Sequence, residues 1–116
     1  MIIRFKKMNL GKVYHGTCKA FVVYALQNNN LFGGPEISYT PDLAHAKMFA
    51  NSWATQRGRS RLKEFFGAIP EEYSQGVIIE ISKEDIKGLK KTMDAGAIEF
   101  VGKGPIELNE NVGFKE

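Results

Sequence analysis

Val13-Tyr14-His15-Gly16-Thr17 is an extended, largely apolar run that carries a histidine in its middle. Two later runs have the same character: Ile37-Ser38-Tyr39-Thr40-Pro41-Asp42 contains a tyrosine, and Ala97-Ile98-Glu99-Phe100-Val101 contains a glutamate. Burying an unpaired polar group costs several kcal/mol, so a strand interior seldom carries one that has neither a partner nor a task. We therefore expect three side chains to share one site, namely His15, Tyr39 and Glu99.

The composition indicates one soluble globular domain that spans residues 1–116. Hydrophobic residues make up 43% and charged residues 25% of the chain, the usual balance of a soluble protein. The longest apolar run, Phe21-Val22-Val23-Tyr24-Ala25-Leu26, is far shorter than the roughly 20 residues of a membrane span. The N-terminus lacks the apolar core and cleavage site of a signal peptide, so we expect a cytoplasmic protein with no membrane partner.

A metal site or an intramolecular disulfide is not expected. The chain has one cysteine, Cys18, and two histidines, His15 and His45, and their spacing fits no metal-ligand motif. The candidate site therefore has to work with carboxylate, imidazole and aromatic groups alone.

Strands dominate the second half of the chain without alternating helix and strand units, which favours an α+β fold with a mixed or mostly antiparallel sheet. The apolar patterns predict strands at residues 2–5, 12–17, 36–40, 76–81, 97–101 and 105–108, with the 76–81 strand central and covered on both faces. They predict helices at residues 19–27, 40–54 and 60–67, a loop at 68–75 and a capped helical turn at 82–88. The second helix is expected to begin at Thr40-Pro41-Asp42, with the Thr40 hydroxyl as its N-cap.

The order of these motifs resembles the ADP-ribosyltransferase superfamily. The points of likeness are His15-Gly16-Thr17 at a strand end, Ser38-Tyr39-Thr40 before a helix, and a late strand that bears Glu99. The similarity is closer to the diphtheria-toxin-like and poly(ADP-ribose)-polymerase-like branch, with its ordered His, Tyr and Glu, and it extends from about residue 13 to 108. It implies two small mixed or antiparallel sheets that form a cleft for NAD, with flanking helices.

The resemblance implies that three residues are catalytic. Glu99 would orient the 2'-hydroxyl of the nicotinamide ribose and stabilise the positive charge that develops as nicotinamide leaves. His15 would bond the ribose on the adenosine side of NAD, and Tyr39 would offer an aromatic face to the nicotinamide ring.

Further residues would bind NAD without taking part in the reaction. The backbone of Gly16 would meet the nicotinamide carboxamide, because a glycine allows a close approach. Ser38 would bond the same carboxamide, and Phe49 would be the second aromatic wall. Thr17 belongs to the same NAD-binding motif.

Several of these assignments have rivals in the sequence. Glu107, within Gly104-Pro105-Ile106-Glu107, is an alternative catalytic carboxylate. Taken singly, the histidine fits a satisfied strand end and each aromatic fits a core position. Two residues before Glu99 the chain has Ala97, where arginine-modifying relatives have Glu or Gln, so arginine modification is disfavoured. The small size of the chain also disfavours polymer synthesis.

The formal net charge is +3, and several basic residues lie in Gln56-Arg57-Gly58-Arg59-Ser60-Arg61-Leu62-Lys63. Such a run attracts phosphate groups through charge. The plain interpretation is a solvated loop at the end of a helix. As a site it would contact the acceptor rather than NAD, because it has no glycine-rich phosphate cradle. The acceptor-binding candidates are Arg57, Arg59 and Arg61.

We therefore expect an NAD-dependent ADP-ribosyltransferase, of the glycosyltransferase class, that transfers one ADP-ribose to an unidentified protein, nucleic acid or small molecule and releases nicotinamide. Two alternatives stay open. RNA 2'-phosphotransferases share the His-Gly-Thr start, although they carry an additional N-terminal domain. A catalytically inactive module of the same fold would use these residues only to bind NAD or a protein.

Overall fold

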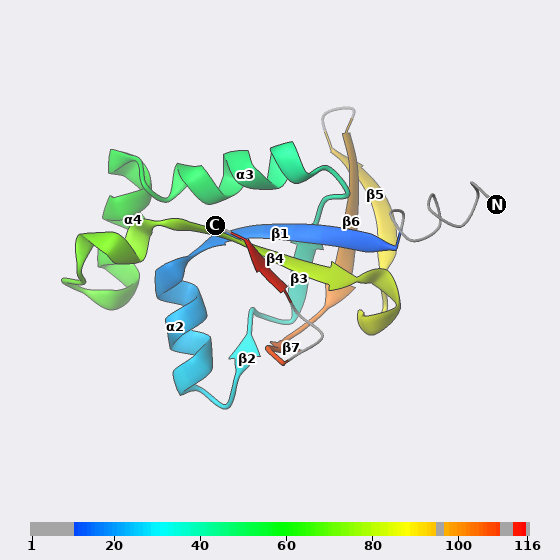
Figure 1. The fold of residues 1–116 in the computed structure, drawn as a ribbon, viewed down its shortest axis with the longest axis horizontal. Helices are drawn as coiled ribbons and strands as arrows, with labels where there is room; N and C mark the ends of the chain where they lie inside the picture. The colour runs from blue at the N-terminus through cyan, green and yellow to red at the C-terminus, as the bar shows by residue number, and fades with distance from the viewer. Residues whose placement is uncertain (1–10, 95–96, 110–112, 116) are drawn as a thin grey trace.

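Strand β1 (Lys12–Cys18) connects two sheets of the protein (Figure 1). On one edge it pairs with β4 (Gly76–Ser82), which also pairs with β8 (Gly113–Lys115). On the other edge Tyr14 and Thr40 exchange two backbone hydrogen bonds of 2.8 Å each, and Thr40 directly follows β3 (Glu36–Tyr39). The first sheet is thereby joined to the sheet that contains β3. The computed structural model describes residues 11–94, 97–109 and 113–115.

The remaining strands complete two further sheets. β3 pairs with β6 (Ala97–Lys103), and β6 pairs with β5 (Lys90–Asp94). β2 (Leu31–Phe32) pairs with β7 (Ile106–Glu107). Every strand pair within the described part of the chain is antiparallel, so the expected α+β class with small antiparallel sheets is confirmed.

Three α-helices of the described residues pack around these sheets: α2 (Lys19–Gln27), α3 (Leu43–Ser52) and α4 (Gln56–Phe66). In Figure 1, α3 runs above β1 and β4, whereas α2 lies below the C-terminal end of β1. Two short 3₁₀ helices, η1 (Glu71–Ser74) and η2 (Lys83–Asp85), flank β4. No helix in the described part of the chain has the length and apolar character that a membrane span requires.

The core lies on both faces of β4, as expected for a central strand. Ile79 and Ile81 belong to the largest apolar cluster, which also contains Val13 of β1 and Tyr39 of β3. Ile78 packs on the other face, against two alanines of α3. The alternation of buried side chains therefore fixes β4 between α3 and the main core.

The expected start of the second helix is wrong by two residues. The N-cap of α3 is Asp42, whose carboxylate accepts a hydrogen bond of 2.9 Å from the amide of Ala44. The Thr40 hydroxyl accepts a hydrogen bond from the amide of Asp42 instead, at 3.1 Å. Thr40 therefore shapes the turn before the cap, and the helix then ends at Ser52 rather than near residue 54.

The basic stretch is helical, which corrects the expected loop. Thr55 caps α4 by accepting a hydrogen bond of 3.2 Å from the amide of Gly58, so the helix begins four residues before the predicted start. Its inward side carries Gly58, Leu62 and Phe66 at four-residue spacing. Such a thin apolar stripe among basic residues is hard to recognise from sequence.

The other helical and extended segments differ less from expectation. α2 has the predicted bounds, and β1, β3, β4 and β6 occupy the predicted runs within two residues at either end. A 3₁₀ helix interrupts the loop expected at 68–75, and the expected turn at 82–88 is the short η2. The strands β2, β5 and β8 were not predicted, and the strand expected at residues 2–5 falls outside the described residues.

Candidate functional site

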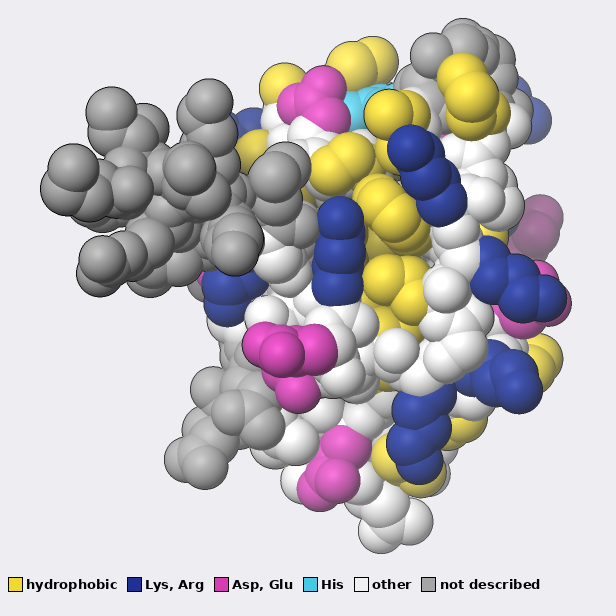
Figure 2. Space-filling model, turned by 90° about the vertical axis from the view of Figure 1, so that its right-hand side faces the viewer, with side chains coloured by type: hydrophobic (Ala, Val, Ile, Leu, Met, Phe, Trp, Pro, Cys, Tyr) yellow, Lys and Arg dark blue, Asp and Glu magenta, His cyan; other side chains and the backbone are white. Residues whose placement is uncertain are grey.

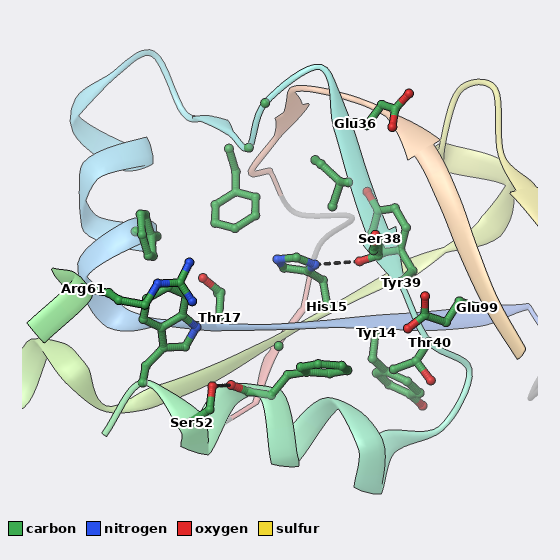
Figure 3. A pocket seen from close by; sticks show the side chains of 18 residues that line it. Tyr14, His15, Thr17, Glu36, Ser38, Tyr39, Thr40, Ser52, Arg61 and Glu99 are labelled. Carbon is green, nitrogen blue, oxygen red and sulfur yellow. Dashed lines mark hydrogen bonds between the residues drawn. The ribbon is translucent and has the colours of Figure 1, made fainter. Parts of the chain in front are cut away.

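A cavity of about 620 Å³ opens beside β1 and β3, and β6, α2, α3 and α4 also contribute to its wall. It collects residues that are more than eighty positions apart in the chain. The lining residues from the predicted site are His15, Gly16, Thr17, Ser38, Tyr39, Phe49, Arg61 and Glu99. Figure 3 shows this arrangement, with the imidazole of His15 near the middle.

His15 has a fixed orientation and a fixed tautomer. Its Nδ1 donates a hydrogen bond of 2.7 Å to the backbone carbonyl of Ser38 on β3. Because a carbonyl oxygen only accepts, Nδ1 carries the hydrogen and Nε2 is an acceptor. The rings of Phe32 and Tyr39 pack against the imidazole in T-shaped contacts, with centroids at 5.5 and 6.1 Å. Figure 3 shows the second ring nitrogen directed away from Ser38 and into the cavity.

The imidazole is neutral near pH 7. Burial of the ring lowers the pKa of His15 below its ordinary value of 6.5, and the hydrogen bond to Ser38 opposes this effect only in part. A neutral, oriented Nε2 can accept a hydrogen bond from a ligand hydroxyl, but it cannot act as a cation toward phosphate.

We predict that His15 makes the protein less stable in mild acid. A lowered folded-state pKa means that the unfolded chain binds the proton more readily, so stability is lost as the pH falls from 6.5 toward the folded-state pKa. This slope cannot exceed about 1.4 kcal/mol per pH unit for one proton. Urea unfolding between pH 8 and pH 5, roughly the range in which histidines titrate, measures it. His15→Gln should flatten the slope, and His45→Gln is the matched control; an equal slope in wild type and His15→Gln would contradict the prediction.

Glu99 lies at one end of the cavity, on the strand that neighbours β3. Its place opposite Thr40 follows from the register, in which Tyr39 pairs with Phe100. Since Thr40 in turn bridges to Tyr14, the backbone of Glu99 lies two strand spacings from β1, about 10 Å. Among the described residues no cation lies within ion-pair distance of Glu99. The rival carboxylate, Glu107, is exposed on β7 and lines a different hollow.

Tyr39 lines the cavity but presents little of its ring to it. Its side chain is only 2% exposed and belongs to the main core, and burial raises the pKa of its hydroxyl to about 12. The hydroxyl oxygen is buried and has no hydrogen-bond partner in the described part of the protein, which costs about 1–3 kcal/mol. The expected stacking of a ligand ring on Tyr39 is not supported by this burial.

Phe49 offers the aromatic surface that Tyr39 does not. It is 48% exposed at the wall formed by α3, where it stacks on His45 with centroids 4.9 Å apart. A planar ligand ring could therefore pack against Phe49 from the cavity side. Both Phe49 and Ser38 line the cavity, and their roles in binding NAD stay predictions.

The reason expected for Gly16 differs from the one that the structure provides. A Cβ on Gly16 would clash with the carbonyl oxygen of Ala46 and lie 2.8 Å from the amide nitrogen of Ala50. Both atoms belong to the backbone of α3 and cannot move aside independently. The close approach that requires glycine here is therefore that of helix α3 to β1, although Gly16 also lines the cavity.

The three arginines expected to act together are separated by the helix. Arg61 lines the cavity opposite Glu99, with its guanidinium 5.0 Å from the ring centroid of Trp53. Arg59 points elsewhere and forms an exposed ion pair of 3.0 Å with Glu71. Arg57 does not line the cavity. At 100° per residue, Arg59 faces the opposite side of α4 from Arg57 and Arg61, so the three cannot form one surface. Arg57 shares the side of Arg61 but lies one turn earlier, outside the cavity.

The sequence also missed a group of residues at the Arg61 end of the cavity. Trp53 falls in the helix predicted at residues 40–54 and Phe21 in the helix predicted at 19–27, and neither was expected at the site. Their rings meet edge to face, 5.2 Å apart, and both line the cavity together with Thr17 and Ser52. The sequence signal that could have pointed to this end of the cavity is the arginine run, which begins close after Trp53 in the chain.

Comparisons of this chain with protein-family models, with curated proteins and with solved structures found no match. The functional argument therefore depends on the geometry of the cavity.

Proposed function

We propose that the protein uses NAD as a substrate and transfers its ADP-ribose to an acceptor with release of nicotinamide. One observation carries the proposal: a neutral, oriented imidazole stands between a carboxylate at one end of the cavity and a guanidinium at the other. Figure 3 shows Glu99 and Arg61 at these opposite ends. The order of charges and hydrogen-bonding groups suits the parts of NAD.

NAD carries a cationic nicotinamide ring at one end and an anionic diphosphate farther along. Figure 3 shows Thr17 and Arg61 toward one end of the cavity and Tyr14 and Glu99 toward the other. Thr17 is three residues along β1 from Tyr14, so the two ends are about 10 Å apart. An elongated ligand can therefore place its cation near the carboxylate and its phosphates near the guanidinium. In place of the acceptor contact expected from the sequence, we assign Arg61 to the phosphates of NAD, because it alone of the three arginines lines the cavity. Its guanidinium would bind phosphate oxygens by paired hydrogen bonds, and Trp53 holds it in place.

In the reaction the bond between the ribose carbon and the nicotinamide nitrogen breaks, and its electron pair leaves with nicotinamide. The acceptor supplies the electron pair for the new bond to that carbon and loses a proton. Positive charge grows on the ribose in between, and a fixed carboxylate at Glu99 stabilises it. Nε2 of His15 accepts a hydrogen bond from a ribose hydroxyl, and the exposed ring of Phe49 packs on the nicotinamide.

We predict that Arg61→Gln weakens NAD binding. Removing the charge that faces the diphosphate should raise the KM for NAD by about tenfold to a hundredfold, since a hydrogen bond to a charged group contributes about 1.5–3 kcal/mol. The kcat should change less, because Arg61 is remote from the carbon that reacts. Release of nicotinamide from NAD, with water as acceptor, measures both constants. Arg57→Gln, one helical turn earlier and outside the cavity, is the matched control.

Two results would count against the proposal. If wild-type protein released no nicotinamide and calorimetry detected no NAD binding, the proposed substrate would be wrong. If Arg57→Gln raised the KM as much as Arg61→Gln, the effect would come from net charge rather than from the cavity.

A further inference from the structure

The sheet β3-β6-β5 has one face that the core covers only in part. Tyr39, Phe100 and Lys91 are neighbours across the three strands, and Ile98 lies opposite Met93 two pairs farther along, on the same face. The face is buried at Tyr39, half-buried at Phe100, and exposed at the end of the hairpin, where Ile98 is 42% and Met93 69% exposed. The two exposed aliphatic side chains therefore form one patch that continues the core, rather than isolated exposed residues.

Lysines border this apolar strip. Lys91 stands beside Phe100 on the same face, and the Nζ of Lys83 lies 4.4 Å from the centre of the Phe100 ring. Lys87 and Lys90 are exposed in the adjoining segment. Figure 2 shows the result from the side that carries β5 and β6, a column of hydrophobic side chains with Lys or Arg side chains on both sides of it.

We propose that this face, formed by Met93, Ile98, Phe100, Lys83 and Lys91, docks an acidic protein segment that carries aliphatic side chains. Carboxylates of the segment meet the lysines, and its aliphatic groups cover Met93 and Ile98. Glu84 and Asp85 of η2 are exposed close in sequence to Lys83 and limit where the carboxylates can lie.

The chemistry of the face favours a polypeptide over a nucleic acid. A base-stacking platform needs an open aromatic face, but Lys83 already lies over Phe100. The exposed apolar groups, Met93 and Ile98, are aliphatic, and the flanking cations named here are lysines rather than the arginines that pair with phosphates in two-pronged contacts. Compact lysine charges on flexible stems suit scattered carboxylates.

The docking face is independent of the proposed NAD chemistry. Successive residues of a strand point to opposite faces, so Glu99 faces away from the side that carries Ile98 and Phe100. A segment bound here leaves the cavity accessible while it holds a partner close to it. Binding to this face can therefore be measured in the absence of NAD.

The test is calorimetric titration of the full chain at low salt with a soluble synthetic peptide built from glutamate and leucine. We expect saturable binding that weakens as salt is added. Lys91→Glu should weaken it about tenfold, since an unfavourable contact replaces an exposed ion pair. Met93→Ser, at a side chain mostly outside the core, should weaken it severalfold. Lys47→Glu, an exposed lysine of α3 with the same change in charge, should leave the binding unchanged.

Three outcomes would overturn the proposal. The first is no saturable binding of the peptide to wild-type protein. The second is equal weakening by Lys47→Glu and Lys91→Glu, which would indicate attraction by net charge alone. The third is tighter binding of oligothymidylate, lost in Lys91→Glu, which would make the face a nucleic-acid surface. A peptide of glutamate and serine that bound as tightly as the leucine peptide would refute the apolar half of the contact.

Discussion

Glu99→Gln is expected to lower nicotinamide release from NAD by about two to three orders of magnitude, the usual effect of deleting one fixed group that stabilises the transition state. The amide keeps the shape of the side chain and removes its charge. NAD binding, measured by calorimetry, should weaken far less than kcat falls, because the carboxylate stabilises the positive charge on the ribose in the transition state more than the cationic ring of bound NAD. The loss should therefore fall on kcat.

The matched control for this prediction is Glu107→Gln. Glu107 is the rival carboxylate in the sequence, but it lines a separate hollow with Lys87 and Lys103. Its replacement should leave nicotinamide release within about twofold of wild type, the scale of an ordinary surface substitution. The reverse pattern, a large loss in Glu107→Gln and none in Glu99→Gln, would move the catalytic role to the other carboxylate. A parallel loss of NAD binding and turnover in Glu99→Gln would leave Glu99 with a structural role only.

The features of the fold that the sequence predicted well are those with strong local signals. The apolar run of α2 ends at three asparagines, two of which adopt positive φ, so its C-terminal end was predictable. β4 is β-branched and apolar at Val77, Ile78, Ile79 and Ile81, as expected for a strand buried on both faces. Where two capping side chains compete, as Thr40 and Asp42 do before α3, the sequence could not decide which of them closes the helix.

The features that escaped prediction depend on contacts between distant segments. β5 reads Lys90-Lys91-Thr92-Met93-Asp94, with no apolar alternation, and is a strand because its backbone pairs with β6. In the site, a polar residue inside an apolar strand marked His15 and Glu99 as candidates. Nothing local marked Trp53, because an aromatic at helical spacing has the same pattern whether it faces the core or a cavity. The position of Trp53 at the cavity depends on a contact with a distant segment, because its ring packs against the guanidinium of Arg61 in α4.

Gly16→Ala is expected to destabilise the protein by about 3 kcal/mol, near the upper end of the effect of forcing an extra carbon into a packed interior. The added Cβ would meet backbone atoms of Ala46 and Ala50, and relief would require α3 to move away from β1. Because α3 also packs on β4 through Ile78, that movement would open a second contact.

Gly34→Ala is the matched control, since Gly34 lines the same cavity but no atom lies within 4 Å of its added Cβ. The free energy of unfolding of Gly34→Ala should differ from wild type by less than about 1 kcal/mol, because the alanine fits without a clash and lowers the conformational entropy of the unfolded chain. Urea unfolding without NAD decides between the two reasons for the glycine. A large loss in Gly16→Ala alone assigns Gly16 to the packing of α3, whereas unchanged stability with impaired NAD binding would return it to the role that the family resemblance implied.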